Sequence, residues 1–224
     1  MAEQGNQCVK MDRMYGWQRH IYDLTRKFYL LGRDRLLREL PVADGDYVLE
    51  VACGTGRNLA RLNRQHPGLH LYGLDASRQM LHTAARKLGD MAVLRHSLAE
   101  SFHYRDTFGL AKPFDCMFLS YGLTMMPCWR EALECCLGSL KPGGHFWIID
   151  FWDQAELPPS IQRGLQRWLS AFGVSFNAGM LDHLVEWHNL GLAGVSIESI
   201  ARRYAFLAQV HSINKNHADY VTDM

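Results

Sequence analysis

Tyr47-Val48-Leu49-Glu50-Val51-Ala52-Cys53-Gly54-Thr55-Gly56 is the stretch that decides the fold of this chain. Its apolar run predicts a buried strand, which carries an acidic residue near its end and closes in a Gly-x-Gly turn. Residues 57–66 predict a helix with Leu59 and Leu62 on one side. A buried strand that enters a helix through a glycine turn forms the ligand-binding corner of an open α/β sheet.

The composition is that of an ordinary globular protein. The chain has 224 residues, enough for one sizeable core, with 48% hydrophobic and 21% charged residues. Its net charge of +1 gives no reason to expect a nucleic-acid partner. The six cysteines form no C-x-x-C pair and have no histidine at zinc spacing, so we expect reduced thiols and no metal. Neither a secretory signal nor a run of about 18 apolar residues is found, so a cytoplasmic protein is expected.

Apolar runs alternate with helical spacings after the glycine corner. This alternation predicts a parallel sheet with right-handed crossovers. The last two apolar runs, 195–200 and 204–210, are separated by three residues. That separation is too short for a crossover and predicts an antiparallel hairpin. Further strands are expected at 69–75, 92–98, 114–121 and 145–151, helices at 77–88 and 129–140, and a helix exit and turn at Lys141-Pro142-Gly143-Gly144.

The fold class is therefore α/β, a Rossmann-like sheet of seven strands flanked by helices, with five parallel strands and a terminal antiparallel hairpin. Residues 42–152 and 191–224 form the main domain. Residues 153–190 are interpreted as a helical insertion near the substrate site, with helices at about 160–172 and 181–190.

Residues 1–41 form an N-terminal helical segment. Its apolar residues recur at helical spacing, Gly32 is a place where the helix can divide, and Pro41 ends it. Residues 10–39 hold eight Lys/Arg against four Asp/Glu. Two interpretations stay open: a solvated amphipathic helix packed on the domain, or a lid whose basic face meets an anionic surface. The apolar stripe comprises Trp17, Ile21, Leu24, Phe28 and Leu31.

The ligand of the glycine corner follows from what surrounds it. Leu59 stands where a dinucleotide fingerprint requires its last glycine, and no Gly-Lys-Ser/Thr follows as in a P-loop. Asp75 ends the next strand, where a carboxylate can accept from both hydroxyls of a ribose. The alternative is that Asp75 only caps the helix that follows.

The glycine corner, the strand-tip Asp75 and Lys141–Gly144 before the fifth strand occur together and in order. Over about residues 45–210 the chain resembles the class I S-adenosylmethionine-dependent methyltransferases. The resemblance implies S-adenosylmethionine as the cofactor and S-adenosylhomocysteine as its product. It implies the methionine part at Glu50, Ala52, Gly54, Thr55 and Gly56, the ribose at Asp75, the adenine at Ala76, Met80, Ser97 and Leu98, and the transferable methyl near Ser120 and Tyr121.

The acceptor is not fixed by that family. Ser120-Tyr121-Gly122-Leu123 stands where nucleobase methyltransferases often carry Asn-Pro-Pro-Tyr, which argues against a nucleic-acid substrate. Aromatic residues gather where a substrate would enter, although most are expected in the core. Aromatic faces suit a sulfonium donor and a methylated ammonium product, so N-methylation fits better than O-methylation.

A closer resemblance concerns residues 11–34, which include Gln18-Arg19-His20-Ile21-Tyr22-Asp23-Leu24, and Ile149-Asp150-Phe151-Trp152-Asp153-Gln154. Both segments look like BtaB-type diacylglyceryl-homoserine N-methyltransferases of betaine-lipid synthesis. The resemblance implies three methyl transfers to the amine of a lipid with an amino-acid head group, and a functional partner that transfers the aminocarboxypropyl group. It implies peripheral association with an anionic membrane surface at the inner face. The alternatives are another aminolipid, a soluble small molecule or a quinone.

Individual roles in the N-terminal segment follow from charge. Arg26 or Arg33 can hold a carboxylate of the cofactor or the lipid, and we favour Tyr22 and Arg26 near the cofactor. For each arginine, an ion pair with Asp23 or Asp34 is the alternative. Tyr22, Ser120 and Tyr121 are the expected catalytic residues. If a base is needed, His20, His145, Asp150 and Tyr121 remain candidates.

Overall fold

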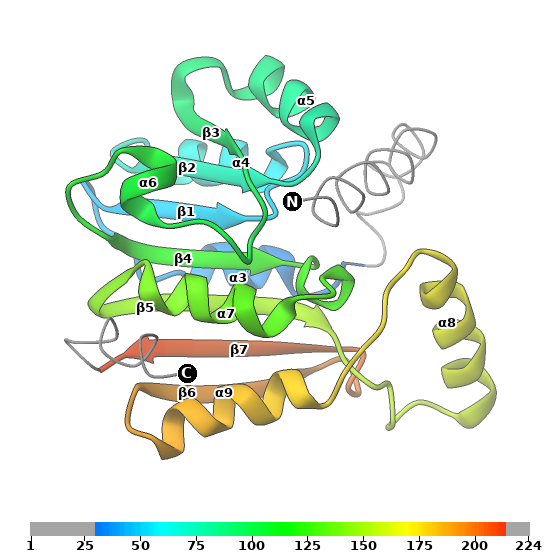
Figure 1. The fold of residues 1–224 in the computed structure, drawn as a ribbon. Helices are drawn as coiled ribbons and strands as arrows, with labels where there is room; N and C mark the ends of the chain where they lie inside the picture. The colour runs from blue at the N-terminus through cyan, green and yellow to red at the C-terminus, as the bar shows by residue number, and fades with distance from the viewer. Residues whose placement is uncertain (1–29, 214–224) are drawn as a thin grey trace, which may run out of the picture.

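The computed structural model describes residues 30–213 and shows a seven-stranded sheet in the order β3-β2-β1-β4-β5-β7-β6 (Figure 1). The first five strands run parallel, and β7 runs antiparallel to both β5 and β6. This confirms the predicted class of fold. The strands are β1 (Tyr47–Val51), β2 (His70–Asp75), β3 (Ala92–His96), β4 (Phe114–Ser120), β5 (Leu140–Phe151), β6 (Ala193–Ile200) and β7 (Ala205–Ser212).

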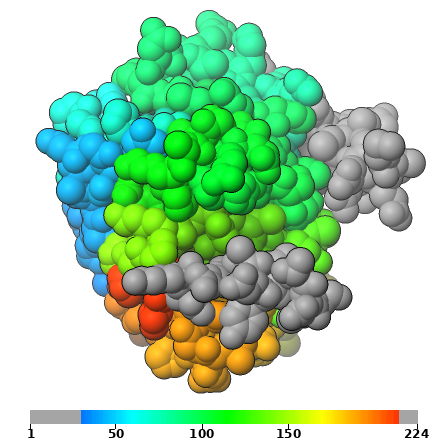
Figure 2. Space-filling view, turned by 60° about the vertical axis from the view of Figure 1, so that its left-hand side comes forward, coloured from blue at the N-terminus to red at the C-terminus, as the bar shows by residue number. Residues whose placement is uncertain are grey.

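Helices cover both faces of the sheet. The α-helices are α3 (Arg33–Glu39), α4 (Arg57–Gln65), α5 (Arg78–Leu88), α6 (Tyr104–Phe108), α7 (Trp129–Gly138), α8 (Pro159–Ala171) and α9 (Gly179–Asn189). Short 3₁₀ turns occupy Gly89–Met91 and Leu123–Met125. In Figure 2 the surface follows the order of the sheet, from the β3 edge at the top to α9, in orange, at the bottom. None of the helices within residues 30–213 combines the length and the apolar character needed to cross a bilayer.

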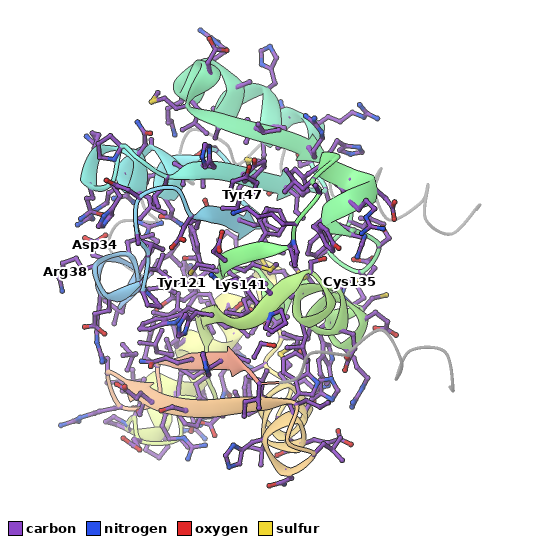
Figure 3. The ribbon with its side chains drawn as sticks, turned by 90° about the vertical axis from the view of Figure 1, so that its left-hand side faces the viewer. Asp34, Arg38, Tyr47, Tyr121, Cys135 and Lys141 are labelled. Carbon is purple, nitrogen blue, oxygen red and sulfur yellow. The ribbon has the colours of Figure 1, made fainter. Side chains whose placement is uncertain are left out.

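Alternating residues of each strand build two cores. Met117 and Leu119 of β4 belong to one core, which α7 and α9 cover, whereas Phe118 belongs to the core under α3, α4 and α5. Figure 3 shows α3, with Asp34 and Arg38, and α7, with Cys135, on opposite sides of the sheet. Because the inner strands β1 and β4 are buried on both faces, they read as nearly continuous apolar runs in the sequence.

The turn predicted at 141–144 is wrong. Residues Lys141–Gly144 lie inside β5, where the pairing with β4 shifts between Phe114↔Leu140 and Cys116↔His145. One side-chain contact and one backbone conformation stabilise the irregular segment. The Lys141 Nζ donates to Asp115 Oδ1 at 2.6 Å, and Gly143 adopts a φ of +73° that favours glycine. A bulge therefore absorbs the residues that the sequence suggested would leave the sheet.

The N-terminal segment is described only from Leu30 onward. Within it, α3 begins after Gly32, whose φ is +76°, and ends before Pro41, as the sequence predicts for the second half of the segment. Leu31 is 38% exposed. The rest of the apolar stripe, Trp17–Phe28, lies outside the described residues. The division of the chain into an N-terminal segment, a main domain and an insertion stays a prediction, although α9 packs against α7 and β6 as a regular covering helix.

Gly56 is expected to resist any side chain. Its φ is +70°, and a Cβ there would lie 2.6 Å from Leu88 Cδ1 and 3.1 Å from Ala84 Cβ of α5. Gly109 has the same φ of +70° with nothing within 4 Å of a Cβ, and it is therefore a matched control. We expect Gly56→Ala to lower the free energy of unfolding by about 2 kcal/mol or more, and Gly109→Ala by about 1 kcal/mol. If both variants lost the same free energy of unfolding in urea, the contact of the new side chain with α5 would cost nothing.

Candidate functional site

The turn after β1 has an unusual backbone. Ala52, Gly54 and Gly56 all lie in the left-handed region, with φ of 57°, 53° and 70°. The Cys53 amide donates to the Leu74 carbonyl of β2 at 2.9 Å, and the Gly56 amide donates to the Cys53 carbonyl at 3.0 Å. A left-handed alanine costs about 1 kcal/mol and is typical of a site where function fixes the backbone. The turn then leads into α4, whose first N–H groups have no partner inside the helix.

Asp75 braces this turn from the end of β2. Its Oδ2 accepts from the Gly54 amide at 2.7 Å, and its Oδ1 accepts from the Ser77 amide at 2.8 Å. The cap of α5 is Ser77, whose Oγ accepts from the Met80 amide at 3.3 Å, so Asp75 is not the helix cap. Asp75 therefore joins the glycine turn to the start of α5, and its role toward a ribose stays a prediction.

A pocket opens beside the turn, at the carboxyl ends of β1 and β4. Glu50, 2% exposed, accepts from Asn58 Nδ2 at 2.7 Å, and Arg33, 7% exposed, supplies a positive charge. An acid and a base in one pocket suit the ammonium and the carboxylate of an amino acid. The lining residues are Leu30, Arg33, Glu50, Ala52, Cys53, Gly54, Thr55, Arg57, Asn58 and Ser120.

Ser120 ends β4 and faces this pocket. Its Oγ is buried and makes no hydrogen bond with any residue of the range 30–213. A buried hydroxyl without a partner costs free energy, which a ligand in the pocket would recover. Cys53 also lines the pocket, but burial raises the pKa of its thiol well above the usual value, so it is no nucleophile.

Of the residues expected near adenine, Ala76, Ser97 and Leu98 follow the ends of β2 and β3, and Met80 lies in the first turn of α5. His96 Nε2 is 2.9 Å from the Ala76 carbonyl oxygen, and the Ser97 amide donates to the Asp75 carbonyl at 3.3 Å. Ser97 Oγ donates to the carbonyl of Leu98 at 3.2 Å. Met80 is buried. These contacts bring the four residues close to Asp75, and their roles toward adenine stay predictions.

Tyr121 follows Ser120 but points elsewhere. Its φ is 58°, its hydroxyl donates to the Leu31 carbonyl at 2.5 Å, and its ring meets Phe151 edge-on at 4.7 Å. Burial raises the pKa of its phenol well above the usual range. Figure 3 shows Tyr121 in the interior, and it is absent from the lining of the pocket. The Tyr121 side chain thus packs in the core and not in the pocket, which argues against its hydroxyl as a base.

Two other candidate bases are also displaced from the pocket. Asp150 is fully buried, and its carboxylate accepts from Thr124 Oγ1 at 2.6 Å, the Thr124 amide at 3.1 Å and the Phe151 amide at 2.7 Å. It therefore ties the loop after β4 to the end of β5. His145 lies near the start of β5 beside His211, at the edge opposite the pocket. His20, Tyr22 and Arg26 lie outside the described residues.

Sequence reasoning missed part of the pocket. Arg57 and Asn58 open α4, and Leu30 comes from the segment before α3. The pairing of Asn58 with Glu50 had one available signal, an amide two residues after the Gly-x-Gly turn in a helix that begins at the corner. Among residues 30–213, no cluster of three or more His, Cys, Asp or Glu side chains is placed to hold a metal.

Comparisons with known proteins identify the family of the chain. Residues 49–146 match a family model described as a methyltransferase domain. A demethylmenaquinone methyltransferase of Clavibacter sepedonicus is 31% identical over 179 residues, which cover 74% of this chain and 69% of the relative. The chain spans between 59% and 69% of the length of the first curated relatives it matches.

Two solved structures show the same fold. One is the putative methyltransferase bound to the Haloferax volcanii Trm112 activator, with a TM-score of 0.68, 18% identity, and coverage of 91% of this chain and 99% of the other. The second is the plantazolicin methyltransferase BpumL in complex with a monoazolic desmethylPZN analog and S-adenosylhomocysteine. Its TM-score is 0.67 at 14% identity, with coverage of 95% and 98%.

Proposed function

The chain belongs to the S-adenosylmethionine-dependent methyltransferases, and from that premise we propose that it methylates a lipid-soluble acceptor at the carboxyl edge of the sheet. The first candidate acceptor is a ring carbon of a prenylated quinol. The observation that carries this candidate is the match to a demethylmenaquinone methyltransferase over 74% of the chain. It corresponds to the quinone alternative among the expected substrates.

The pocket fits the cofactor by its chemistry. Glu50 and Arg33 offer charges opposite to the ammonium and the carboxylate of the methionine part, and Asp75 offers two acceptors for the ribose. Ser120 Oγ would gain the hydrogen-bond partner that it lacks among residues 30–213. These four residues come from α3, β1, β2 and β4, so the sheet edge holds them in one constellation.

Bound S-adenosylmethionine would supply the methyl group: its transfer to the ring carbon would break the C–S bond and leave S-adenosylhomocysteine, and the proton that the ring carbon loses would pass to water. The chain's own task is then to position and desolvate. In this proposal Asp75 and the left-handed turn orient the cofactor, and the support for a role of Ser120 is that it lines the same pocket from the end of β4. Holding two reactants in such an arrangement can supply about 7–11 kcal/mol of the barrier reduction.

A second candidate is the amine of diacylglyceryl-homoserine, methylated three times to diacylglyceryl-trimethylhomoserine. The observation that favours it is the segment Ile149–Gln154, which resembles the BtaB-type enzymes. This segment begins at the end of β5, which pairs with β4, the strand that carries Ser120 of the pocket. The other matching segment, residues 11–29, lies outside the described residues. This candidate would require a partner that transfers the aminocarboxypropyl group.

One assay separates the two candidates. Full-length protein and labelled S-adenosylmethionine are added to vesicles that contain either a prenylated naphthoquinol or diacylglyceryl-homoserine, and products are identified by mass. We expect a single methyl on the quinol. Up to three methyl groups on the homoserine amine would instead establish the second candidate. Methylation of a soluble naphthol analogue but of neither lipid would refute a lipid-soluble acceptor.

Arg33→Gln tests the cofactor's carboxylate site. A charge-assisted contact contributes roughly 1.5–3 kcal/mol, so affinity for S-adenosylhomocysteine should fall by about tenfold or more. Methylthioadenosine lacks both the carboxylate and the amine, and its affinity should be unchanged. Arg38→Gln, on the exposed last turn of the same helix, is the matched control. Equal losses for both ligands in calorimetry would show that Arg33 acts on the fold and not on the carboxylate.

A further inference from the structure

Helix α8 projects from the body of the protein on the side where the parallel strands end. Figure 1 shows it beyond the arrowheads of β1, β4 and β5, set apart from the layers of the sheet. Of its residues Pro159–Ala171, only Leu169 is buried. A helix in this position is not needed to close the core, and it lies beside the edge at which the acceptor would enter.

The exposed part of α8 includes large apolar side chains. Ile161 is 56% exposed and Trp168 is 39% exposed, and the Trp168 ring lies 5.0 Å from that of Phe172. Residues 161, 165, 168 and 172 recur at intervals of four, three and four, which places them on one face of the helix. That face continues from the partly buried Leu165 outward to solvent. Exposed apolar stripes of this kind mark protein or membrane contacts.

The charge of this region favours a membrane over a protein as the partner. The 25 residues Leu157–Leu181 carry Arg163 and Arg167 and no Asp or Glu. Both arginines are exposed. An amphipathic helix with Trp and Ile on one side, basic residues elsewhere and no acids has the composition of an interfacial helix. Its charge complements the phosphates of anionic lipids.

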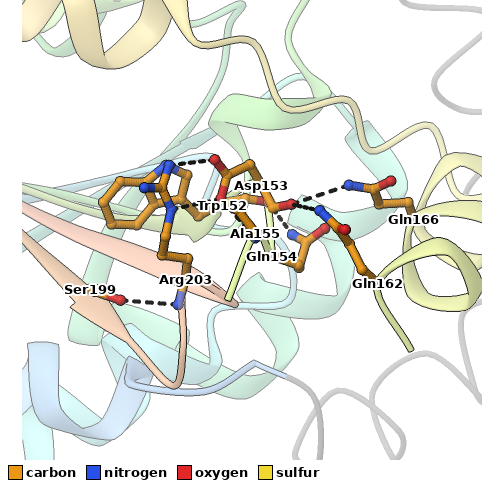
Figure 4. Close-up of polar contacts among 8 residues, drawn as sticks. All are labelled: Trp152, Asp153, Gln154, Ala155, Gln162, Gln166, Ser199 and Arg203. Atoms are coloured by element: carbon orange, nitrogen blue, oxygen red, sulfur yellow. Dashed lines mark hydrogen bonds and ion pairs between the residues drawn. The ribbon is translucent and has the colours of Figure 1, made fainter. Parts of the chain in front are cut away.

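The helix is also held in a fixed orientation. The Asp153 carbonyl, just after β5, accepts from Gln162 Nε2 at 3.0 Å and from Gln166 Nε2 at 3.1 Å (Figure 4). The Asp153 carboxylate in turn forms a two-pronged pair with Arg203, with one contact of 2.8 Å from Nε to Oδ1. The Arg203 guanidinium stacks on the Trp152 ring at 4.4 Å. These contacts hold α8 against the segment after β5, which is itself paired with the residues before β7, so a surface that binds α8 would be aligned with the sheet edge.

We propose that α8 docks the protein on an anionic lipid bilayer, with Ile161 and Trp168 entering the interface and Arg163 and Arg167 meeting lipid phosphates. The proposal rests on the lipid-soluble acceptor for its purpose. Docking in this orientation brings the carboxyl edge, and with it the pocket at Ser120, toward the membrane surface. An acceptor would then reach the site without crossing water.

The test is flotation of full-length protein with vesicles of phosphatidylcholine alone or mixed with phosphatidylglycerol. Ile161→Ser/Trp168→Ser removes the two apolar side chains that are proposed to enter the bilayer. This variant should therefore partition into the vesicles at least about tenfold more weakly than the wild type. Val185→Ser/Leu190→Ser removes an apolar side chain of α9 and one that directly follows it, 45% and 64% exposed, and this variant should float like the wild type. Unchanged flotation of the α8 variant would overturn the proposal. So would a concentration-dependent dimer that the same variant abolishes.

The arginines have a separate readout. Arg163→Gln/Arg167→Gln should weaken binding to the anionic vesicles by about fivefold for each charge and leave binding to phosphatidylcholine unchanged. The control is Arg38→Gln, which lies on α3 and should bind as the wild type does. Equal losses on both kinds of vesicle would refute a headgroup contact.

Failure of the proposed function and failure of docking are distinguishable. Vesicle flotation needs no methyl transfer, and binding of S-adenosylhomocysteine reports folding because α8 contributes nothing to the pocket lining. If the α8 variants lose flotation while no acceptor is methylated by wild type, the docking surface stands and the acceptor is wrong. If lipid acceptors are methylated and the variants float normally, the acceptor stands and the docking surface is wrong.

Discussion

Asp75→Ala is expected to weaken the binding of S-adenosylhomocysteine by at least about 100-fold, because hydrogen bonds to a charged group contribute roughly 1.5–3 kcal/mol each. The substitution removes the acceptor for two ribose hydroxyls. It also removes the acceptors of the Gly54 and Ser77 amides, at 2.7 and 2.8 Å, which hold the glycine turn in place. Calorimetric titration with S-adenosylhomocysteine measures the loss.

Two further variants sharpen this test. Asp75→Asn keeps one acceptor oxygen and should retain part of the affinity. Asp90→Ala removes an exposed carboxylate from the same half of the sheet and should bind as the wild type does. Circular dichroism distinguishes a folded Asp75→Ala protein from an unfolded one. A folded variant with wild-type affinity would mean that other residues hold the ribose.

Asp150 is expected to make stability fall as pH rises from about 4 to about 6. Burial raises the pKa of this carboxyl from 3.8 to about 6. The folded protein therefore binds the proton more tightly than the unfolded chain does. Its contribution is fully present below pH 4, and it is lost as pH rises through the folded-state pKa. The difference between the unfolded-state and folded-state pKa values corresponds to a loss of about 3 kcal/mol in the free energy of unfolding between those two pH limits.

Asp150→Asn isolates this contribution, because the amide does not titrate. An asparagine oxygen in the place of Oδ1 can still accept from the Phe151 amide and Thr124 Oγ1, whereas its NH2 would face the Thr124 amide and lower stability equally at every pH. Relative to wild type, the variant's free energy of unfolding should rise by about 3 kcal/mol between pH 4 and pH 7. Asp34 and Asp115, whose pKa values are lowered by Arg61 and Lys141, change stability in the opposite sense in both proteins. If the free energies of unfolding of the two proteins, measured in urea, changed equally with pH across this range, the assignment to Asp150 would be wrong.

Much of the fold was readable because its signals are local. The buried strand before the glycine turn and the three residues between the last two strands both indicate topology without any long-range information. The segment Lys141–Gly144 shows where this fails. Pro and Gly are read as a turn, yet a contact of Lys141 with Asp115, 26 residues earlier, helps to hold the segment in the sheet. Tertiary contacts of this kind override local preference.

The site was predictable in its cofactor part and less so elsewhere. Asp75 and Glu50 are found at strand ends because the alternation of strands and helices places the ends on one edge. The direction of Tyr121 could not be read, because a left-handed backbone turns its side chain away from the position that strand alternation suggests. The pairing of Asn58 with Glu50 depends on how α4 leaves the turn.

The position of β7 between β5 and β6 has a consequence for biosynthesis. The cofactor corner is assembled from residues up to Ser120, whereas the outer edge of β5 can pair only after β7 leaves the ribosome. Synthesis of the roughly sixty residues from Phe151 to Ser212 takes about 3–12 s. For that interval the nascent chain carries an open, apolar strand edge to which another nascent chain could add. The time at which β7 is translated thus sets how long this edge of β5 stays open.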